Sequence, residues 1–301
     1  MASKTYGSQT AAIGIVRAFN RTVTQRVGAL NEAYLELERP LGASRVLWEI
    51  AESGTDARSI RNRLDLDSGY LSRLLRMLEG KGLISVEPDS SDQRVRVIRL
   101  TEAGRAERAE LDRRSNQLAW SLVEGLDDER RSELLEAMKT VQRLLIAGLI
   151  DIRVEDPRSD AARFCIESYF DEINRRFDAG FDREANMPGV FAMAEPQGLF
   201  LVARLRGEPI GCGGLRFHAD EPPDIKRMWI SPDARGLGLG RRLLSELERH
   251  AREHGATIIR LETNRVLREA IQLYRSAGYV EVPPFNDELY AHHWFEKQLS
   301  D

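Results

Sequence analysis

The chain has 301 residues, 42% of them hydrophobic and 31% charged, and its formal net charge is −4. This length predicts about two domains, and the composition is that of a globular protein rather than a disordered or fibrous one. No apolar run reaches the roughly 20 residues of a membrane span. The N-terminal sequence lacks the apolar core of a signal peptide, so we expect a cytoplasmic protein with no membrane partner.

Cysteine usage and charge narrow the function classes further. Cys165 and Cys212 lie in apolar surroundings, which predicts two buried thiols and neither a disulfide framework nor a metal site. The first 150 residues are almost neutral and the remainder is acidic. The bulk charge therefore neither favours nor excludes binding to nucleic acid. Only the local placement of arginines can indicate such binding.

Hydrophobic periodicity in the first half predicts four helices followed by a hairpin of two strands. Asp56 is suited to cap the third helix and Asp67 or Ser68 the fourth, with a tight turn at residues 65–67 between them. The predicted helices and strands lie at residues 11–37, 46–50, 57–64, 68–79, 83–87 and 95–100. Helix, turn, helix and hairpin in this order make a winged helix-turn-helix, which places its second helix in the major groove of DNA.

Polar side chains on the helix at 68–79 and on the hairpin are candidates for DNA contacts. We expect Arg76 at a phosphate, Arg94 and Arg96 in the minor groove or at phosphates, and the others in the major groove. The candidate DNA-binding residues are Ser68, Tyr70, Ser72, Arg73, Arg76, Arg94 and Arg96. The alternative interpretation is an ordinary solvated helix face.

The stretches LDLDSGYLSRLLRMLEGKGLI and DQRVRVIRLTEAG resemble the MarR family of transcription regulators, and the resemblance covers roughly residues 10–148. The wing signature of that family falls on Asp92, Arg94, Leu100 and Thr101. The resemblance implies a mainly α domain in which Asp92 braces Arg94 at the wing tip. It also implies a double-stranded DNA operator and a homodimer, in which helices at 102–123 and 127–146 pair with the first helix.

The second half predicts an α+β domain with a mixed sheet of six or seven strands. One helix begins near Ser159 or Asp160, and another covers residues 268–277. Residues 178–196 are punctuated by glycine and proline, which predicts an irregular loop that faces the substrate. The predicted strands lie at residues 151–154, 199–205, 210–217, 225–230, 257–262, 279–282 and 293–299.

A glycine-rich loop follows the strand at 225–230 and precedes a helix. Free N–H groups and the helix dipole meet at such a helix start, which predicts an anion site, most naturally for a phosphate. A P-loop requires Gly-Lys-Ser/Thr, whereas Gly240 is followed by Arg241 and Arg242. A dinucleotide fold requires G-x-G-x-x-G within repeated βαβ units, which this chain does not have.

Two motifs resemble those of the GNAT N-acetyltransferases: Arg235-x-x-Gly238-x-Gly240 and Ala270-x-x-Leu273-Tyr274-x-x-x-Gly278-Tyr279. The resemblance covers about residues 150–300. It implies a mixed, mostly antiparallel sheet and acetyl-CoA as co-substrate, without a metal. The loop N–H groups and arginines would hold the pyrophosphate, and the edge of the strand at 228–230 would pair with the pantetheine arm. The implied cofactor-binding residues are Met228, Trp229, Ile230, Arg235, Gly236, Leu237, Gly238, Leu239, Gly240, Arg241, Arg242, Asn264, Ala270 and Tyr274.

The resemblance also implies the catalytic groups. Tyr274 takes the role of general acid toward the departing thiolate, although a packing tyrosine is the alternative. The resemblance does not single out the general base. Asp224 starts the central strand and Glu262 lies on the neighbouring one, and each is a candidate, acting directly or through water, with a solvated strand-end carboxylate as the alternative. The N–H of Trp229 or Ile230 would polarise the thioester carbonyl.

One position departs from the family pattern. The asparagine that often stands three residues before Ala270 is Leu267 in this chain, and Asn264 is the candidate for the missing amide. The tail at residues 285–295 is expected to line the acceptor pocket, but nothing in the sequence names the acceptor.

The prediction for the whole chain is a winged-helix regulator at residues 1–148 joined to an N-acetyltransferase at 149–301, acting on a small amine or amino acid. Two alternatives stay open: an acetyltransferase whose winged-helix half only dimerises, and a regulator whose second half only senses CoA. The fusion also suggests the hypothesis that acceptor or acetyl-CoA tunes DNA binding.

Overall fold

The computed structural model describes residues 2–30, 34–37, 39–88, 96–177, 189 and 192–299, with the side chains of the first eight residues left out. The chain forms two compact units, Met1–Ala137 and Met138–Asp301. The predicted domain boundary at residues 148 and 149 stays a prediction. Within the described residues, no helix is long and apolar enough to cross a membrane.

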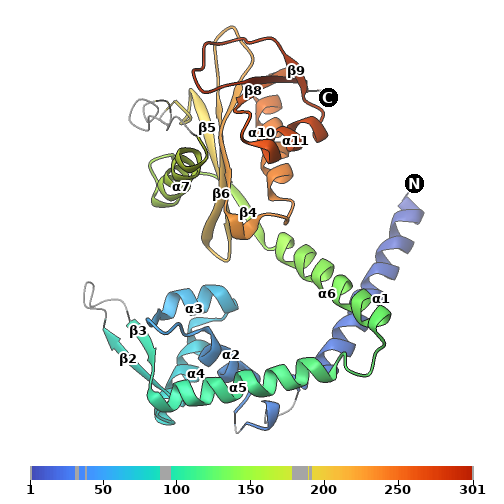
Figure 1. Cartoon of the computed structure of the whole chain (residues 1–301), viewed down its shortest axis with the longest axis vertical. Helices are drawn as coiled ribbons and strands as arrows, with labels where there is room; N and C mark the ends of the chain where they lie inside the picture. The colour runs from blue at the N-terminus through green and yellow to red at the C-terminus, as the bar shows by residue number, and fades with distance from the viewer. Residues whose placement is uncertain are drawn as a thin grey trace. The chain divides into compact units, whose positions relative to one another are not determined.

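The N-terminal unit has the predicted order of helices and strands (Figure 1). It contains α1 (Ala2–Arg26), η1 (Tyr34–Glu36), α2 (Leu41–Glu49), β1 (Thr55–Asp56), α3 (Ala57–Leu64), α4 (Ser68–Gly80), β2 (Ile84–Pro88), β3 (Arg96–Leu100), α5 (Glu102–Ser121) and the start of α6 (Asp128–Gly148). The first helix was predicted at residues 11–37, which is wrong at its C-terminal end. A turn at 27–30 containing Gly28 (φ 65°) ends it earlier.

Local capping explains the helix-turn-helix. The Asp56 carboxylate accepts a hydrogen bond from the Ser59 N–H at 2.9 Å, and Asp67 accepts one from Tyr70 N–H at 2.8 Å. Asp65 takes a left-handed conformation (φ 51°) that reverses the chain between α3 and α4. Both predicted caps are confirmed. The sequence did not predict β1, whose Thr55 pairs with Ile98 and adds a third strand to the hairpin.

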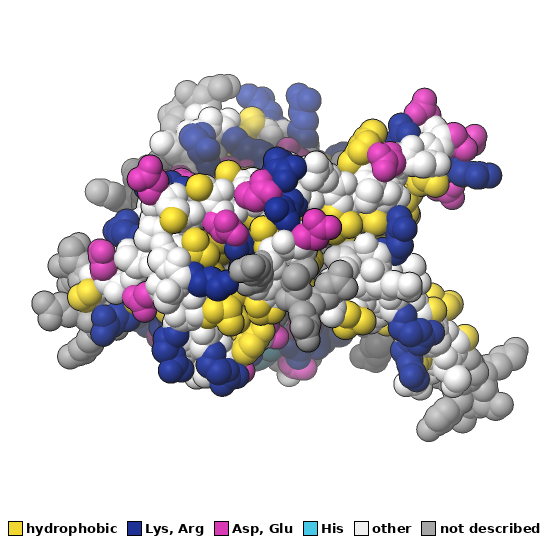
Figure 2. All heavy atoms as spheres, turned by 90° about the horizontal axis from the view of Figure 1, so that it is seen from below, with side chains coloured by type: hydrophobic (Ala, Val, Ile, Leu, Met, Phe, Trp, Pro, Cys, Tyr) yellow, Lys and Arg dark blue, Asp and Glu magenta, His cyan; other side chains and the backbone are white. Residues whose placement is uncertain are grey.

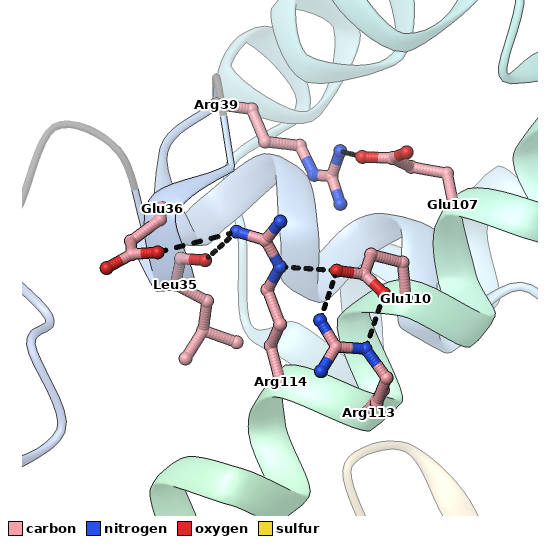
Figure 3. A network of polar contacts seen from close by, with 7 residues as sticks. All are labelled: Leu35, Glu36, Arg39, Glu107, Glu110, Arg113 and Arg114. Atoms are coloured by element: carbon pink, nitrogen blue, oxygen red, sulfur yellow. Dashed lines mark hydrogen bonds and ion pairs between the residues drawn. The ribbon is translucent and has the colours of Figure 1, made fainter.

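A network of arginines and glutamates ties the segment before α2 to α5 (Figure 3). The side chain of Arg39 is 3% exposed, pairs with Glu107 and donates to the Ser44 hydroxyl at 3.0 Å. Arg114 donates to the Leu35 carbonyl at 2.8 Å and also pairs with Glu110. These contacts fix Leu35 and Arg39, which lie just before α2, against the long α5 helix.

The second unit is a seven-stranded sheet with helices on both faces. Its elements are the end of α6, β4 (Ile150–Val154), α7 (Asp160–Arg176), β5 (Gly198–Leu205), β6 (Glu208–Arg216), β7 (Asp224–Ile230), η2 (Pro232–Ala234), α10 (Leu239–Glu253), β8 (Ile258–Thr263), α11 (Arg268–Ser276), β9 (Val280–Val282) and β10 (His293–Gln298). The strand order is β4-β5-β6-β7-β8-β10-β9. The β7–β8 pair is parallel and the other pairs are antiparallel, which confirms the mixed, mostly antiparallel sheet.

Two apolar clusters hold the helices to this sheet. Leucines of α10 and Ile271 of α11 pack on one face. On the other face, Cys165 and Phe170 of α7 pack with Cys212 and Trp229. Figure 1 shows α7 on one side of the sheet and α10 with α11 on the other. The two thiols are free and buried, as predicted.

Candidate functional site

The two parallel strands at the centre of the sheet separate soon after they meet. β7 and β8 are in register at Asp224 with Arg260 and at Ile225 with Leu261. β7 continues to Ile230, and in this fully described part of the chain its later residues have no backbone partner on β8. The separation exposes a strand edge, which is the requirement for an extended ligand to bind as an added strand.

Backbone irregularities accompany the separation. Arg227 has a left-handed φ of 55°, although it is not glycine and stands inside a strand. The pairing of β7 with β6 shifts register between Cys212 and Gly214. A bulge of this kind bends a strand and re-aims its side chains. The irregularity lies directly after the last pair of β7 with β8.

The glycine loop leads from β7 to an uncapped helix start. Gly236 and Gly238 have φ values of 79° and 76°, which favour glycine strongly. No side chain caps α10, and the first N–H that finds a carbonyl one turn earlier is that of Arg242, at 3.2 Å from Gly238 O. The N–H groups of residues 239–241 therefore stand together without partners inside the helix, as an anion site requires.

Gly240 has a different reason to be glycine. A methyl group added there would lie 3.0 Å from side-chain carbons of Ile230 and Leu273. Its absence lets the first turn of α10 approach both the end of β7 and α11.

Two cavities adjoin along the separated edge of β7. The loop-side cavity reaches the glycine loop, and the tail-side cavity reaches the C-terminal tail. The loop-side cavity is lined by Tyr169, Glu172, Ile173, Arg176, Met228, Trp229, Ile230, Arg235, Leu267, Glu269, Ala270, Leu273 and Tyr274. The tail-side cavity is lined by Tyr169, Ile173, Phe177, Ile225, Lys226, Arg227, Met228, Glu262, Thr263, Asn264, Leu267, Ala270, Tyr274, Glu288, Tyr290 and Ala291. Tyr274 and five other residues line both, so the cavities meet beside this phenol.

Tyr274 projects from α11 and is 6% exposed. Burial raises its pKa well above the ordinary value near 10, and the nearby Tyr169 and Glu262 raise it further. The phenol is therefore protonated across the neutral range and keeps a proton that it can donate. This is the protonation state that a general acid requires.

The structure separates the two candidate bases. Glu262 lines the tail-side cavity, where it pairs with Lys226 and accepts a long hydrogen bond from Asn286 at 3.4 Å. Asp224 is not among the lining residues of either cavity. Its carboxylate lies 3.0 Å from His218 Nε2 and 3.8 Å from Lys226 Nζ. Of the two, Glu262 has the access that a base needs.

The loop arginines have partners of their own. Arg235 donates to Glu172 at 2.7 and 2.8 Å, and Arg241 donates to the Ser276 hydroxyl at 2.8 Å. Arg242 donates to the carbonyls of Ala147 and Ile150 at 2.6 and 2.9 Å. The N–H of Arg242 closes the first helical turn and its side chain joins the end of α6 to the start of β4, and its contact with pyrophosphate stays a prediction.

Asn264 also lies elsewhere than expected. It lines the tail-side cavity and not the loop-side one. Its amide nitrogen donates to the Tyr290 carbonyl at 2.7 Å, and its oxygen accepts from the Val266 N–H at 3.1 Å. The side chain anchors the tail, which explains how the tail becomes a cavity wall.

Sequence reasoning missed Glu172 on α7. Its carboxylate accepts from the Trp229 indole at 3.0 Å, from Arg235, and lies 3.1 Å from Arg176 Nε. One carboxylate thus joins α7, β7 and the glycine loop. Arg176 is a local partner one helical turn away, but Trp229 and Arg235 are 57 and 63 residues away, so no local signal marks the role of Glu172.

The outward face of α4 matches most of the expected DNA-binding set. Ser68, Ser72, Arg73 and Arg76 are exposed, as is Arg96 on β3. Tyr70 is half-buried, its hydroxyl would lie 2.5 Å from a methyl group placed on Gly42, and its contact with DNA stays a prediction. The same ring also stacks with Arg73, whose guanidinium carbon is 5.6 Å from the ring centre. Asp92 and Arg94 lie outside the described residues.

Comparison with known proteins agrees with the families predicted for both halves of the chain. The Acetyltransferase (GNAT) family model matches residues 159–279, and the MarR family model matches residues 42–95. IAA acetyltransferase of Azospirillum brasilense is 35% identical over 138 residues, which cover 45% of this chain and 88% of that protein. The HTH-type transcriptional regulator TtmR of Methylorubrum extorquens is 42% identical over 67 residues, covering 22% of this chain and 33% of the regulator.

Among solved structures, the PaiA N-acetyltransferase of Thermoplasma acidophilum, in complex with coenzyme A, is 18% identical with a TM-score of 0.41. The match covers 50% of this chain and 98% of that one. The chain belongs to the GNAT acetyltransferase family, and a MarR-family winged helix precedes its acetyltransferase domain. Among the described residues, no group of three or more His, Cys, Asp or Glu side chains is placed to hold a metal ion.

Proposed function

We propose that the chain is a bifunctional protein: a DNA-binding regulator and an acetyl-CoA-dependent N-acetyltransferase for a small amine or amino acid. The observation that carries the enzymatic half is the meeting of the two cavities at Tyr274, beside the separated edge of β7. One cavity leads to a phosphate-type anion site and the other to a polar pocket. A donor and an acceptor can therefore approach one point from two directions.

Acetyl-CoA supplies the activated acetyl group. The N–H groups at residues 239–241 are the donors for the pyrophosphate, and the edge of β7 at Met228–Ile230 pairs with the pantetheine amides. Arg241 lies at the same helix start and adds positive charge. Arg235 donates to Glu172, so it can add positive charge at this site only while it also keeps that ion pair or after it breaks it.

Residues of the chain then carry out two proton transfers. The acceptor amine, with an ordinary pKa near 10, must lose a proton before it can attack. Glu262 accepts this proton directly or through water. Tyr274 donates one to the departing thiolate, and the N–H of Trp229 or Ile230 stabilises the negative charge on the carbonyl oxygen.

The winged-helix half is proposed to bind operator DNA as a homodimer. The exposed arginines and serines of α4 support the DNA contacts. The dimer is supported by exposed apolar side chains on α1, including Ile13, Val16 and Phe19. Figure 2 shows hydrophobic side chains at the surface among arginines and acidic residues.

The test is release of free thiol from acetyl-CoA by the purified full chain with a panel of amines and amino acids. Turnover with at least one acceptor supports the enzyme. Binding of CoA without turnover of any acceptor would favour the sensor alternative. Gel shifts of wild type and of Arg73→Ala with Arg94→Ala separate a DNA reader from a half that only dimerises, because a mere dimerisation domain loses no DNA affinity. Repeating the shifts with acetyl-CoA and acceptor tests whether the two functions are coupled.

A further inference from the structure

Two phenols stand where the loop-side and tail-side cavities meet. Six residues line both cavities, and four of them carry apolar side chains: Ile173, Met228, Leu267 and Ala270. The other two are Tyr169 and Tyr274. Their hydroxyls are the side-chain O–H groups of this shared wall in the described part of the chain. The proposed reaction gives Tyr274 a role and leaves Tyr169 without one.

The two phenols come from opposite sides of the sheet. Tyr169 belongs to α7 and Tyr274 to α11, and these helices cover different faces (Figure 1). Burial is the main cause of the raised pKa of Tyr274, and Tyr169 is close enough to raise it further. A donor and an acceptor that meet at this point therefore have one phenol on either side.

Ring contacts hold Tyr169 and leave its oxygen unused. The ring centre lies 5.5 Å from that of Phe170, at an interplanar angle of 61°, and 5.6 Å from the guanidinium carbon of Arg227. Such contacts involve the faces and edges of rings rather than the hydroxyl. Tyr169 is half-buried, and its hydroxyl has no hydrogen-bond partner within the described residues. A phenol that is removed from solvent usually has such a partner, so this oxygen is available to a substrate.

We infer that Tyr169 is a further catalytic residue: its phenol oxygen accepts a hydrogen bond from the acceptor nitrogen while that nitrogen attacks the thioester. A neutral primary amine attacks with its lone pair and carries two N–H groups. Glu262 takes the proton of one, and the other stays in the amide product. The second N–H gains positive character as the new bond forms, and a phenol oxygen can accept a hydrogen bond from it. The inference rests on the proposed acetyl transfer and adds a residue to it.

The step balances with the groups already named. The lone pair of the nitrogen forms the bond to the acyl carbon, and the electron pair of the C–S bond leaves with the sulfur. One N–H proton passes to Glu262, and Tyr274 gives its proton to the thiolate. Tyr169 neither gains nor loses a proton, and its hydrogen bond fixes the direction of the nitrogen lone pair.

The experiment compares primary amines with their N-methyl derivatives. A secondary amine that transfers its one proton to Glu262 has no N–H left for Tyr169. The panel of amines and amino acids is therefore offered to the full chain in matched pairs, such as glycine with N-methylglycine, at saturating acetyl-CoA. Thiol release gives kcat/KM for each acceptor, and the ratio of the primary amine over its N-methyl derivative reports the second N–H.

Variants test whether the Tyr169 hydroxyl is the partner of that N–H. Tyr169→Phe keeps the ring and removes the oxygen. It should lower kcat/KM for primary amines by about tenfold or more, as loss of a charge-assisted hydrogen bond predicts, and change the value for N-methyl derivatives little. The ratio therefore falls, while KM for acetyl-CoA stays near the wild-type value. Tyr279→Phe removes the hydroxyl of a tyrosine that lines neither cavity, and it should leave the ratio unchanged.

Several outcomes overturn the inference. An unchanged ratio in Tyr169→Phe does so, and so does an equal loss with both members of a pair, because the hydroxyl would then act on the thioester and not on the nitrogen. Where neither protein turns over an N-methyl derivative, the primary amine decides alone, and its undiminished kcat/KM in Tyr169→Phe overturns the inference. The proposed acetyl transfer stands in all these cases. Absence of turnover with every acceptor removes the proposed enzyme and this inference together.

Discussion

Lys226 on β7 and Glu262 on β8 form an ion pair one residue beyond the last register pair of the two strands, Ile225 with Leu261. The pair lies where the strands begin to separate. Both side chains are largely buried, with 16% and 9% of their side-chain surface exposed. The pair therefore holds the Glu262 carboxylate in a defined position on the wall of the tail-side cavity.

The first prediction distinguishes the two candidate bases. Glu262→Gln is expected to lower kcat by about 10²-fold or more at neutral pH, because it removes proton acceptance and keeps the shape. Asp224→Asn is the matched control and is expected to change kcat little, since Asp224 lies with His218 outside both cavities. Steady-state rates between pH 6 and 9 measure both. Equal losses in the two variants would contradict the assignment.

The second prediction concerns the pH range over which Tyr274 keeps its proton. Burial raises its pKa above the ordinary value of 10. The phenol is therefore fully protonated below pH 10 and loses its proton only at a pH above that ordinary pKa. The wild-type kcat should show no decline caused by Tyr274 up to about pH 10. Tyr274→Phe should lower kcat and leave KM for acetyl-CoA nearly unchanged.

Acyl donors with different leaving thiols provide the control that tests Tyr274 as the general acid. Acyl donors whose thiols have a lower pKa need less protonation on departure, so they should recover part of the rate in Tyr274→Phe. A tyrosine that only packs against the cofactor would change KM for acetyl-CoA instead.

The third prediction uses two glycines with the same backbone conformation. Gly238 has φ 76° at the start of α10, Gly255 has φ 83° after its end, and a methyl group at either would meet open space. Alanine at each should destabilise the chain by about 1 kcal/mol. The Gly238→Ala variant should also raise KM for acetyl-CoA severalfold, because it distorts the anion site. Thermal unfolding and steady-state kinetics of both variants separate strain from binding.

The fourth prediction concerns DNA. Arg76→Ala should weaken binding to specific and random duplexes alike and lower the slope of log affinity against log salt by about one, as loss of one phosphate contact does. Arg73→Ala should weaken the preferred sequence more than random DNA. Arg113→Ala on α5 removes an arginine that pairs with Glu110, and it should leave both affinities unchanged. Fluorescence anisotropy measures the affinity of each of the three variants for a duplex selected from a random library and for a random duplex, at several salt concentrations.

The fifth prediction concerns the network that anchors the turn before α2. Glu107→Gln leaves the guanidinium of Arg39, 3% exposed, without its carboxylate and should cost about 2 kcal/mol of stability. Glu110→Gln should cost less at neutral pH because its partners Arg113 and Arg114 are far more exposed than Arg39.

Acid dependence separates these two carboxylates. Hydrogen bonds from Arg113 and Arg114 lower the pKa of Glu110 from its ordinary value of 4.5 to about 2. Its contribution to stability is therefore present above pH 4.5 and is lost as pH falls toward 2, and Glu110→Gln should remove that pH dependence. Urea unfolding of the two variants at pH 7 and pH 3 measures both effects.

Local patterns in the sequence determined the elements of both halves. The caps at Asp56 and Asp67, the left-handed turn between them and the spacing of Gly236, Gly238 and Gly240 are short-range features. Each depends on a few neighbouring residues, so the sequence alone predicted the winged helix, the glycine loop and the order of strands. The two separated motifs of the second half predicted its family for the same reason.

Only the tertiary structure decided which side chains meet. It placed Glu262 on a cavity wall and Asp224 on neither, directed Arg242 to the carbonyls of Ala147 and Ile150, and joined Glu172 to Trp229 and Arg235, which are far away in sequence. The separation of β7 from β8 likewise depends on a bulge at Arg227 and on packing against α7. These contacts depend on how segments far apart in the sequence pack together. A periodicity or motif within one stretch of sequence does not show which distant segment packs against it.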